Sequence, residues 1–579
     1  MFGLFKKKKG KEFAPSVDEK RQAIVDALPP AKQELKHLIP EIKNYTPVGD
    51  LVWQALVNAD DAELKSLLLG KVIPNVPPEL AQKIKDIGKR SAWADYDHLR
   101  ENGLVHLQNK RSFVGFGRFD LGGVDTLLEF DGEGHLATIA PTGAGKGQGH
   151  IIPALYDYIG PVFVLDPKGE NYRETAWRRR WFGNVFKWAP FEEETDTFNP
   201  LDYIKGYDDA RVLANLIVVT AGKSDPFWDR SAIDLLVGLV LYVKSSRPPE
   251  LQNMREVCRL LAPSKVEYEE FLDALKEVGD ERLTETSNIL SDQPENVRMG
   301  IFQTLRSHVD VWRSDEITRA TSLTTEDFDP SNIMDRQALT DVSVEMGVDD
   351  EDIGPSVIPV TAPDGSEGQG FIRGQSDSVF LIVPQDKIAS YSGVLRVVVG
   401  MFINEITKYV AGREAVQEPG ERRSYTPMMF LLDELPQLGY MDIIENSIVI
   451  ARSSRMRFWL FAQALDQLIE LYPKAKTMLS NCRLKMFFNL ADLHTARYVS
   501  EYLGEATDLF GQKNEVLTPQ ELMGPNYKNT QIVIPQGMSP IKARLRLKYE
   551  DENLKMVDLR FRDFWIDSDD RKNMAGRLS

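Results

Sequence analysis

The eight residues Ala140-Pro-Thr-Gly-Ala-Gly-Lys-Gly147 decide the fold class of this chain. A short apolar run, His135–Ala140, leads into them, and the apolar-periodic segment Ile151–Tyr156 follows. This order predicts a buried strand, a glycine loop and a helix. Glycines let such a loop curl until successive N–H groups point at a phosphate, and the positive end of the helix faces the same anion. The stretch therefore predicts a nucleotide-binding loop.

The loop departs twice from the Walker A pattern G-x-x-x-x-G-K-[ST]. Ala140 replaces the first glycine, and Gly147 replaces the hydroxyl residue that normally holds Mg²⁺. Lys146 stands where the Walker lysine reaches the β- and γ-phosphates. A merely flexible glycine turn is the alternative. The residues expected to surround a nucleotide are Pro141, Thr142, Gly143, Ala144, Gly145, Lys146, Gly147 and Gln148.

A second motif lies near residue 430. The apolar run Met428–Leu432 ends in Asp433 and Glu434, as a Walker B strand does. Asp433 would hold Mg²⁺, and Glu434 would orient and deprotonate the attacking water. A core strand that happens to end in two acids is the alternative. Two such motifs, each at a strand end, together predict a P-loop ATPase with ATP and Mg²⁺ as cofactors.

Other polar residues follow predicted strands. Gln463 ends the strand Phe458–Ala462, where a side chain faces the γ-phosphate and senses it, unless it is an ordinary strand-end residue. Arg452 and Arg455 close the helix after Walker B. An arginine there is placed to reach the ATP of a neighbouring subunit as a finger. Basic residues also suit a helix C-terminus through the helix dipole, which is the alternative.

Asp166 follows another continuous apolar run, Val162–Leu165, and Lys168 comes two residues later. Because a buried parallel strand delivers polar residues to the ligand edge of a sheet, both are candidates for binding the nucleotide or a neighbouring subunit. A turn built from Pro167 and Gly169 is the alternative.

Composition bounds the class of protein. The 579 residues are too many for one core, and 42% apolar with 27% charged residues is typical of globular proteins. The net charge of −17 argues against a protein that coats itself in DNA, although a local basic groove remains compatible with it. Cys258 and Cys482 lie far apart and predict no disulfide framework. No run reaches the roughly 18 apolar residues of a membrane-spanning helix.

Strands alternate with helices over 135–200 and 376–535, which predicts a mostly parallel α/β sheet covered by helices. Residues 202–320 are helical by spacing, so we expect an all-α insertion in the sheet domain. The stretch 326–367 holds twelve acidic residues and only one basic residue, and predicts an exposed acidic loop. The expected parts are a basic tail and linker (1–20), a small helical region (21–90), a nucleotide-binding domain (91–200 and 376–545), an all-α insertion (201–375) and a C-terminal tail (546–579).

Taken together, these motifs show that the chain resembles the type IV coupling proteins, the TraG/TraD-type conjugative DNA-transfer ATPases. The Gly-Lys-Gly ending of the loop is itself frequent in that family. The similarity covers about residues 90–545. Its matching stretches are Ser91–Ala94, Gly103-Leu104, Ala140–Gly149, Leu165–Glu170, Phe198–Leu201, Phe227–Asp229, Leu432–Gly439, Asn481-Cys482 and Leu517–Leu522.

The resemblance implies a RecA-like domain with the all-α domain inserted, assembled as a homo-hexameric ring. It implies ATP hydrolysis at subunit interfaces, with Lys146 and Glu434 catalytic, Arg452 as the interface finger and Gln463 as the sensor. The implied substrate is single-stranded DNA with its attached relaxase, or protein effectors, delivered to a type IV secretion channel.

The chain departs from the family at its start. Family members usually open with membrane-spanning helices, whereas here we expect a soluble helical region and a lysine-rich tip, Phe2–Lys11. We therefore expect a cytoplasmic protein, peripheral at the cytoplasmic face of the inner membrane, recruited through a separate membrane-anchor protein or through that tip.

Three hypotheses on function follow. The first is a coupling ATPase for DNA, which would show ATPase activity stimulated by DNA and sensitive to salt. The second is a coupling ATPase that recruits protein effectors only, which the acidic stretch and the net charge suit better. The third is a nucleotide-gated scaffold with negligible turnover, and Glu434 argues against it.

Overall fold

The computed structural model describes residues 30–57, 61–85, 87, 93–105, 113–121, 123–132, 134–180, 182–219, 226–261, 265–334, 357–361, 367–371, 376–414, 426–450, 455–507 and 513–555. The chain divides into two compact units. Unit 1 comprises Met1–Asp95, Ala496–Gly524 and Ser539–Ile541, and unit 2 comprises Tyr96–Thr495, Pro525–Met538 and Lys542–Ser579. The lysine-rich tip and Arg452 lie outside the described residues. The domain boundaries given above remain predictions.

Unit 1 contains the small helical region. Its α-helices are α2 (Pro30–Lys43), α3 (Gly49–Val57), α4 (Asp61–Leu67) and α5 (Pro78–Lys85), with a π turn η1 (Leu68–Val72) and a 3-10 turn η2 (Ile73–Asn75) between α4 and α5. Leucines and isoleucines at helical spacing point inward and form one core, whose members include Leu35, Ile39, Ile42, Val52, Leu56, Leu64 and Leu68. Unit 1 also holds the hairpin β12 (Glu505–Thr507) and β13 (Lys513–Glu515) and the short helix α22 (Pro519–Leu522).

Unit 2 is organised around an eleven-stranded sheet with the order β2-β1-β15-β14-β11-β3-β10-β9-β4-β8-β5. The neighbours from β11 to β5 all pair in parallel, and antiparallel pairs β11–β14, β15–β1 and β1–β2 extend the other end. The strands are β1 (Val114–Leu121), β2 (Val124–Phe130), β3 (His135–Ile139), β4 (Val162–Leu165), β5 (Val185–Trp188), β8 (Ser378–Leu381), β9 (Met428–Leu432), β10 (Met456–Ala462), β11 (Cys482–Phe488), β14 (Thr530–Pro535) and β15 (Ile541–Arg544). The central strands are buried along their whole length because helices cover both faces.

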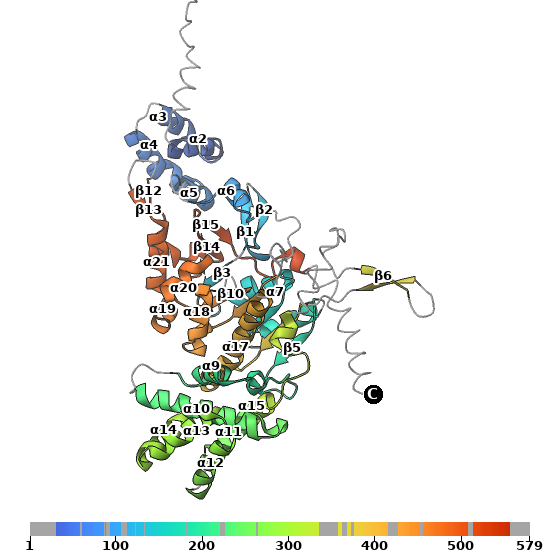
Figure 1. Cartoon of the computed structure of the whole chain (residues 1–579). Coiled ribbons are helices and arrows are strands. Elements are labelled where there is room, and N and C mark those ends of the chain that lie inside the picture. Colours follow the sequence, from blue (N-terminus) through green and yellow to red (C-terminus); the bar gives the residue numbers. More distant parts are fainter. Residues whose placement is uncertain are drawn as a thin grey trace, which may run out of the picture. The chain divides into compact units, whose positions relative to one another are not determined.

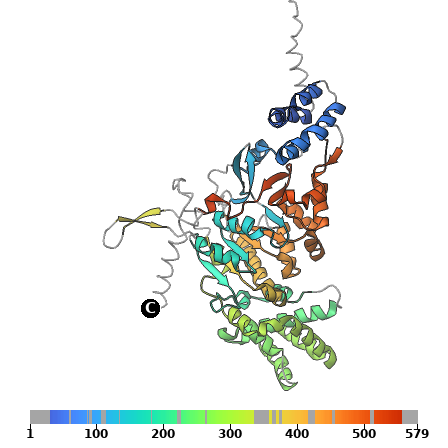
Figure 2. The ribbon, with the colours of Figure 1, turned by 180° about the vertical axis from the view of Figure 1, so that it is seen from behind.

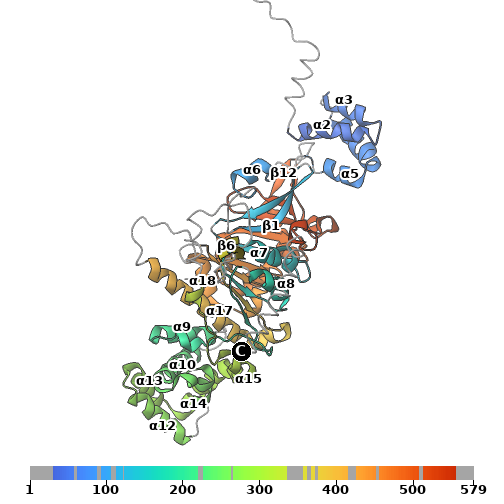
Figure 3. The same cartoon turned by 90° about the vertical axis from the view of Figure 1, so that its right-hand side faces the viewer.

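The direction of each crossover decides which face a helix covers. The connections β3–β4 and β4–β5 move one way along the sheet, whereas β8–β9, β9–β10 and β10–β11 move the other way. Right-handed crossovers then place the two groups of helices on opposite faces. Figure 3 shows α7 and α8 on one side of the sheet and α18 on the other. The first group is α7 (Ile152–Asp157) and α8 (Glu170–Arg179); the second is α17 (Gln385–Glu414), α18 (Asp442–Ile450), α19 (Leu465–Leu471) and α20 (Ala475–Asn481).

A group of helices is inserted between β5 and β8, as the helical spacing predicts (Figures 1 and 2). The apolar stripe of α10, including Leu235, Leu236 and Leu239, is buried. Gly400 of α17 meets α9 closely, because a Cβ atom there would lie 2.4 Å from Leu216 Cδ2. The helices are α9 (Tyr207–Ile217), α10 (Pro226–Ser246), α11 (Met254–Leu260), α12 (Lys265–Glu277), α13 (Glu281–Asp292), α14 (Glu295–Val309) and α15 (Asp315–Thr321).

The expected acidic loop at 326–367 requires a correction at both ends. Phe328, Ile333 and Met334 are buried, so the start of the stretch packs on the core. At the other end β6 (Val357–Thr361) pairs with β7 (Glu367–Phe371) as an antiparallel hairpin. The acidic count hid the buried start of the stretch, because apolar residues interrupt the acids there. The middle of the stretch lies outside the described residues.

Two expectations from composition can be compared with the structure. Cys258 and Cys482 are both buried and free, in agreement with the absence of a disulfide framework. Of the helices in the described ranges, none combines the length and the apolar composition needed to cross a bilayer.

Candidate active site

Five neighbouring parallel strands end at the same edge of the unit 2 sheet, in the order β11-β3-β10-β9-β4. Because parallel strands share a direction, the residues that follow them meet at that edge, which is where open α/β sheets bind ligands. In that order the strands are followed by Asn489, the loop 140–147, Gln463, the pair Asp433 and Glu434, and Asp166. The candidate residues from four separate segments are thereby brought together.

The glycine loop curls as the pattern predicts. Gly143 has a φ of 75° and Gly145 a φ of 101°, a left-handed backbone that side chains with a Cβ rarely adopt. Ala140 and Lys146 are buried, Thr142 and Gly143 are exposed, and the other residues of the loop are half-buried. Gly147 opens a π turn, η4 (Gly147–Ile151), that leads into α7. No crowding requires glycine at this position, since a Cβ atom there would lie 3.8 Å from Asn171 Oδ1.

Three polar side chains form a chain of contacts across the edge. Lys146 Nζ donates to Glu434 Oε1 at 3.2 Å and to the carbonyl oxygen of Ala140 at 3.0 Å. Gln463 Nε2 donates to Glu434 Oε2 at 2.9 Å. Each carboxylate oxygen of Glu434 therefore has its own donor, one after β3 and one after β10. The lysine, the acid and the amide form one polar cluster.

Backbone geometry aims Glu434 at this cluster. Its φ of 57° and ψ of 40° are left-handed, which is uncommon for a residue other than glycine. The 3-10 turn η8 (Leu435–Leu438) follows at once, so the chain turns sharply where β9 ends. Such strain persists only where surrounding contacts hold it, and functional sites concentrate it.

Asp433 lies half-buried beside the cluster, and its Oδ1 atom is buried without a hydrogen-bond partner. Burial, and next the nearby charge of Glu434, raise the pKa of Asp433 to about 7, while Lys146 opposes the shift. A buried carboxylate oxygen without a donor is suited to bind Mg²⁺. Among the residues that the structure describes, no three His, Cys, Asp or Glu side chains form a metal cage. The site therefore fits Mg²⁺ held by one or two carboxylates together with phosphate and water.

Asp166 lies at the same edge and holds the start of α8. Its Oδ2 atom accepts from the backbone N–H of Tyr172 at 2.8 Å and its Oδ1 atom from Asn171 Nδ2 at 3.2 Å, so it fixes the start of α8. Burial raises the pKa of Asp166 to about 6. Lys168 is close enough to lower the pKa of Asp433 by its charge. These contacts agree with the alternative given above, in which Asp166 belongs to a turn built from Pro167 and Gly169.

Two residues that sequence reasoning missed support the loop. Asn489 has a left-handed φ of 50°, and its Nδ2 atom donates to the carbonyl oxygen of Ala144 at 3.0 Å. His150 is fully buried behind the loop, where its ring nitrogens lie 3.0 Å from Thr138 Oγ1 and from Gln531 Oε1. Burial lowers the pKa of His150 to about 4, so the ring is neutral near pH 7. An Asn directly after an apolar strand was the available signal for Asn489.

The remaining candidates are placed as follows. Gln148 points to α8, where its Nε2 atom donates to Glu170 Oε1 at 2.8 Å. Arg455 lies in the turn before β10 with a φ of 53°, and its carbonyl oxygen accepts from the N–H of Met428 at 3.0 Å. Arg452 lies outside the described residues, so its role as a finger remains a prediction.

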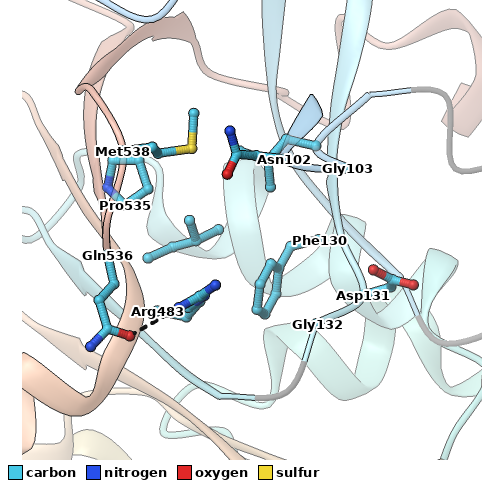
Figure 4. Close-up of a pocket in the computed structure, with 11 residues that line it drawn as sticks. Asn102, Gly103, Phe130, Asp131, Gly132, Arg483, Pro535, Gln536 and Met538 are labelled. Atoms are coloured by element: carbon cyan, nitrogen blue, oxygen red, sulfur yellow. Dashed lines mark hydrogen bonds between the residues drawn. The ribbon is translucent and has the colours of Figure 1, made fainter. Parts of the chain in front are cut away.

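A separate pocket of about 420 Å³ lies where β11 begins and β14 ends, away from the glycine loop. Figure 4 shows Phe130, Arg483 and Gln536 among its lining residues. Arg483 Nη1 donates to Gln536 Oε1 at 3.2 Å, so two neighbouring residues of the lining are hydrogen-bonded to each other. It contains none of the loop or strand-end residues described above, so it is distinct from the candidate site.

A doubly wound sheet with a glycine loop after β3 and an acid pair after β9 defines a P-loop nucleotide-binding protein of the RecA-like class. A family model described as type IV secretory system conjugative DNA transfer matches residues 83–358. A second model, described as the TraM recognition site of TraD and TraG, matches residues 427–530. The chain belongs to the type IV coupling protein family.

Relatives and solved structures agree with this family. Protein VirD4 of Rhizobium rhizogenes is 23% identical over 80% of this chain and 66% of its own length. Conjugal transfer protein TraG of Escherichia coli is 24% identical over 76% of this chain and 68% of its own length. The chain thus spans about two thirds of the length of the curated relatives it matches.

The fold is also similar to that of plasmid coupling protein TrwB, solved in complex with ADP and Mg²⁺. The TM-score is 0.53 at 15% identity, over 79% of this chain and 93% of TrwB. A second TrwB structure, with an ATP analogue that cannot be hydrolysed, gives a TM-score of 0.50. At this identity the likeness establishes the RecA-like fold with its inserted helical domain.

Proposed function

We propose that this protein is an ATP-hydrolysing coupling protein that delivers single-stranded DNA, with its attached relaxase, to a type IV secretion channel. One observation carries the enzymatic part of the proposal. Lys146, Glu434 and Gln463, from the ends of three adjacent strands, are joined by hydrogen bonds at the edge where P-loop proteins bind nucleotides.

Each residue then has a role in phosphoryl transfer. The N–H groups of residues 143–147 and the ammonium of Lys146 would bind the β- and γ-phosphates of ATP. Asp433 would hold Mg²⁺, which supplies charge neutralisation on the transferred phosphoryl group when bound. Glu434 would accept a proton from the attacking water. Gln463 would hold the carboxylate of Glu434 in the orientation that this proton transfer needs.

The shared carboxylate suggests how the nucleotide controls the base. Lys146 has one positive charge to share between Glu434 and the phosphates, and the more highly charged phosphates would draw the ammonium away from the carboxylate. When Lys146 turns to the phosphates, Glu434 loses one donor and keeps Gln463 as its partner. The Oε1 atom is then free to accept a proton from water. We therefore propose that ATP binding itself exposes the catalytic base.

The partners belong to the proposal as well. Descriptions of the matched families name conjugative DNA transfer and TraM recognition, and one relative, TraG of Escherichia coli, is named a conjugal transfer protein. We propose a homo-hexamer in which Arg452 reaches the ATP of the neighbouring subunit. The protein would act at the cytoplasmic face of the inner membrane, held there by a separate membrane-anchor protein.

Recruitment of protein effectors only is the second candidate. The net charge of −17 favours it, because an acidic surface repels the DNA phosphates except at a local basic groove. The rate of ATP hydrolysis with and without single-stranded DNA, at 50 and 200 mM salt, separates the two candidates. Stimulation by DNA that weakens as salt rises supports DNA delivery, because phosphate contacts release counterions. Equal rates with and without DNA, together with binding of effector tails, would support the second candidate.

A further inference from the structure

The chain after the last strand lies directly against the glycine loop. Leu545 and Leu547 are buried in a small apolar cluster with Ala140 and Phe488, and Ala144 packs on it. A Cβ atom on Gly145 or on Gly149 would lie 3.6 Å from Leu547 Cδ2, so this leucine contacts the inner side of the loop. We call residues Leu545–Asp551 the C-terminal brace.

In the π turn η4, one carbonyl oxygen accepts no hydrogen bond from an N–H group of its own helix. The N–H of Ile152 donates to the carbonyl oxygen of Gly147, five residues back. In the same pattern the carbonyl oxygen of Gln148 would accept from residue 153, but Pro153 has no N–H. The backbone N–H of Lys548 donates to that oxygen instead, at 3.0 Å. The brace thus supplies the hydrogen bond that Pro153 cannot.

Ion pairs hold the brace at the other end of the same helix. Arg546, buried with 3% of its side chain exposed, pairs with Asp157 at the end of α7 and with Asp551. Arg118 of β1 also pairs with Asp551. The Lys548 ammonium pairs with Glu174 of α8. Both ends of the segment Gly147–Asp157 are therefore fixed by residues that follow the sheet.

We propose that the C-terminal brace positions the phosphate-binding turn, and that the backbone N–H of Lys548 is the group through which it does so. The inference rests on the proposed nucleotide function. Gln148 is two residues after Lys146, so a shift of its carbonyl group reorients the N–H groups of the same turn. Those N–H groups must converge on a phosphate for the helix end to bind it. Lys548 is a positioning residue and does not touch the nucleotide.

Two substitutions of Lys548 distinguish the contribution of its backbone N–H from that of its side chain. Lys548→Pro removes the N–H donor, whereas Lys548→Ala keeps it and removes only the ammonium. The measurement is the Kd of the full chain for a fluorescent ATP analogue with Mg²⁺. We expect Lys548→Pro to weaken binding about tenfold and Lys548→Ala to change it less than about twofold, because the Gln148 carbonyl loses its donor only in the first.

Rescue tests the role of the hydrogen bond directly. Pro153→Ala returns an N–H to the position that η4 lacks, so Pro153→Ala combined with Lys548→Pro should recover most of the lost affinity. A purely structural defect of proline at 548 would persist in the double variant. If Lys548→Pro does not fold, Leu547→Ala tests whether the brace positions the loop. This variant keeps the backbone hydrogen bonds and removes the side chain that contacts the loop. We expect it to weaken binding about threefold or more.

The outcomes distinguish this proposal from the one on which it rests. Wild-type protein that binds the analogue, with Lys548→Pro binding as tightly as Lys548→Ala, overturns the brace alone. Failure of the double variant to recover affinity overturns the role of the Lys548 N–H. Wild-type protein that does not bind the analogue overturns the proposed nucleotide function and the brace with it.

Discussion

The ammonium nitrogen of Lys146 lies 3.2 Å from Oε1 of Glu434, which joins the end of β3 to the end of β9 across the strand between them. The pair is largely shielded from water, with 7% and 14% of the two side chains exposed. Shielding strengthens the attraction and makes the loss of either partner costly.

Lys146→Ala should abolish tight nucleotide binding. Removing the ammonium leaves the phosphates without their main cation, which should raise the Kd for ATP on the order of 100-fold. Titration with a fluorescent ATP analogue measures the change. Lys276→Ala is a matched control, because it removes one exposed lysine of α12 away from the site. Similar Kd values for the two variants would contradict the assignment of Lys146.

Gln463→Ala should slow hydrolysis while leaving ATP binding nearly unchanged. The variant loses the donor to Glu434 Oε2, which orients the base, while the loop N–H groups and Lys146 would still hold the phosphates. We expect kcat to fall roughly ten- to hundredfold and KM to change little. Steady-state kinetics over a range of ATP concentrations separates the two constants. A large rise in KM with unchanged kcat would instead place Gln463 in ground-state binding.

Gly147→Ser should fold and should need less Mg²⁺ for half-maximal activity. The position has room for a Cβ atom, and the new hydroxyl restores the usual metal contact of the loop. Gly145→Ser is the contrasting variant, because its φ of 101° should cost ~1–2 kcal/mol with a side chain present. Mg²⁺ titrations of ATPase activity and thermal unfolding test both. Equal stability losses at 147 and 145 would show that the loop geometry is wrong.

His150 should make the protein less stable in mild acid. The pKa of His150 is about 4 in the folded chain, against 6.5 for a histidine exposed to water. The unfolded chain therefore binds the proton more readily as the pH falls below 6.5. Between pH 7 and pH 5 this should remove about 2 kcal/mol of stability. Urea denaturation of wild type and His150→Gln at both pH values isolates the contribution, because the other groups titrate in both proteins. A difference between the two proteins that does not change with pH would contradict the buried neutral histidine.

The sequence allowed prediction of the parts of the site that depend on local signals. Apolar runs that end in Asp433 or Gln463 identify strands and their ligand-side ends without knowledge of their neighbours. Their convergence follows from parallel pairing, which alternating strands and helices imply. Gly143 and Gly145 were recognised for the same reason, since a backbone with positive φ requires glycine locally.

Residues that act through tertiary contacts were not predictable in this way. His150 reads as an ordinary position in a helix, and its partners Thr138 and Gln531 come from two different strands. Lys548 acts through its backbone N–H, which every residue except proline has, so the residue type at 548 does not reveal this role. Apolar and basic residues alternate from Ile541 to Lys548, which is a strand signal, but β15 ends at Arg544 and the leucines after it pack against the glycine loop.

Nucleotide trapping by Glu434→Gln tests the central claim most directly. The amide keeps the shape of the side chain but cannot accept the proton from water, so binding should persist while hydrolysis falls by about 10²–10⁴-fold. The measurement is the ratio of ATP to ADP that stays with the protein after incubation with ATP and Mg²⁺ and removal of free nucleotide. We predict that the variant retains ATP whereas wild type retains ADP or none. Wild-type rates of hydrolysis in Glu434→Gln would contradict the claim that the acid after β9 is the catalytic base.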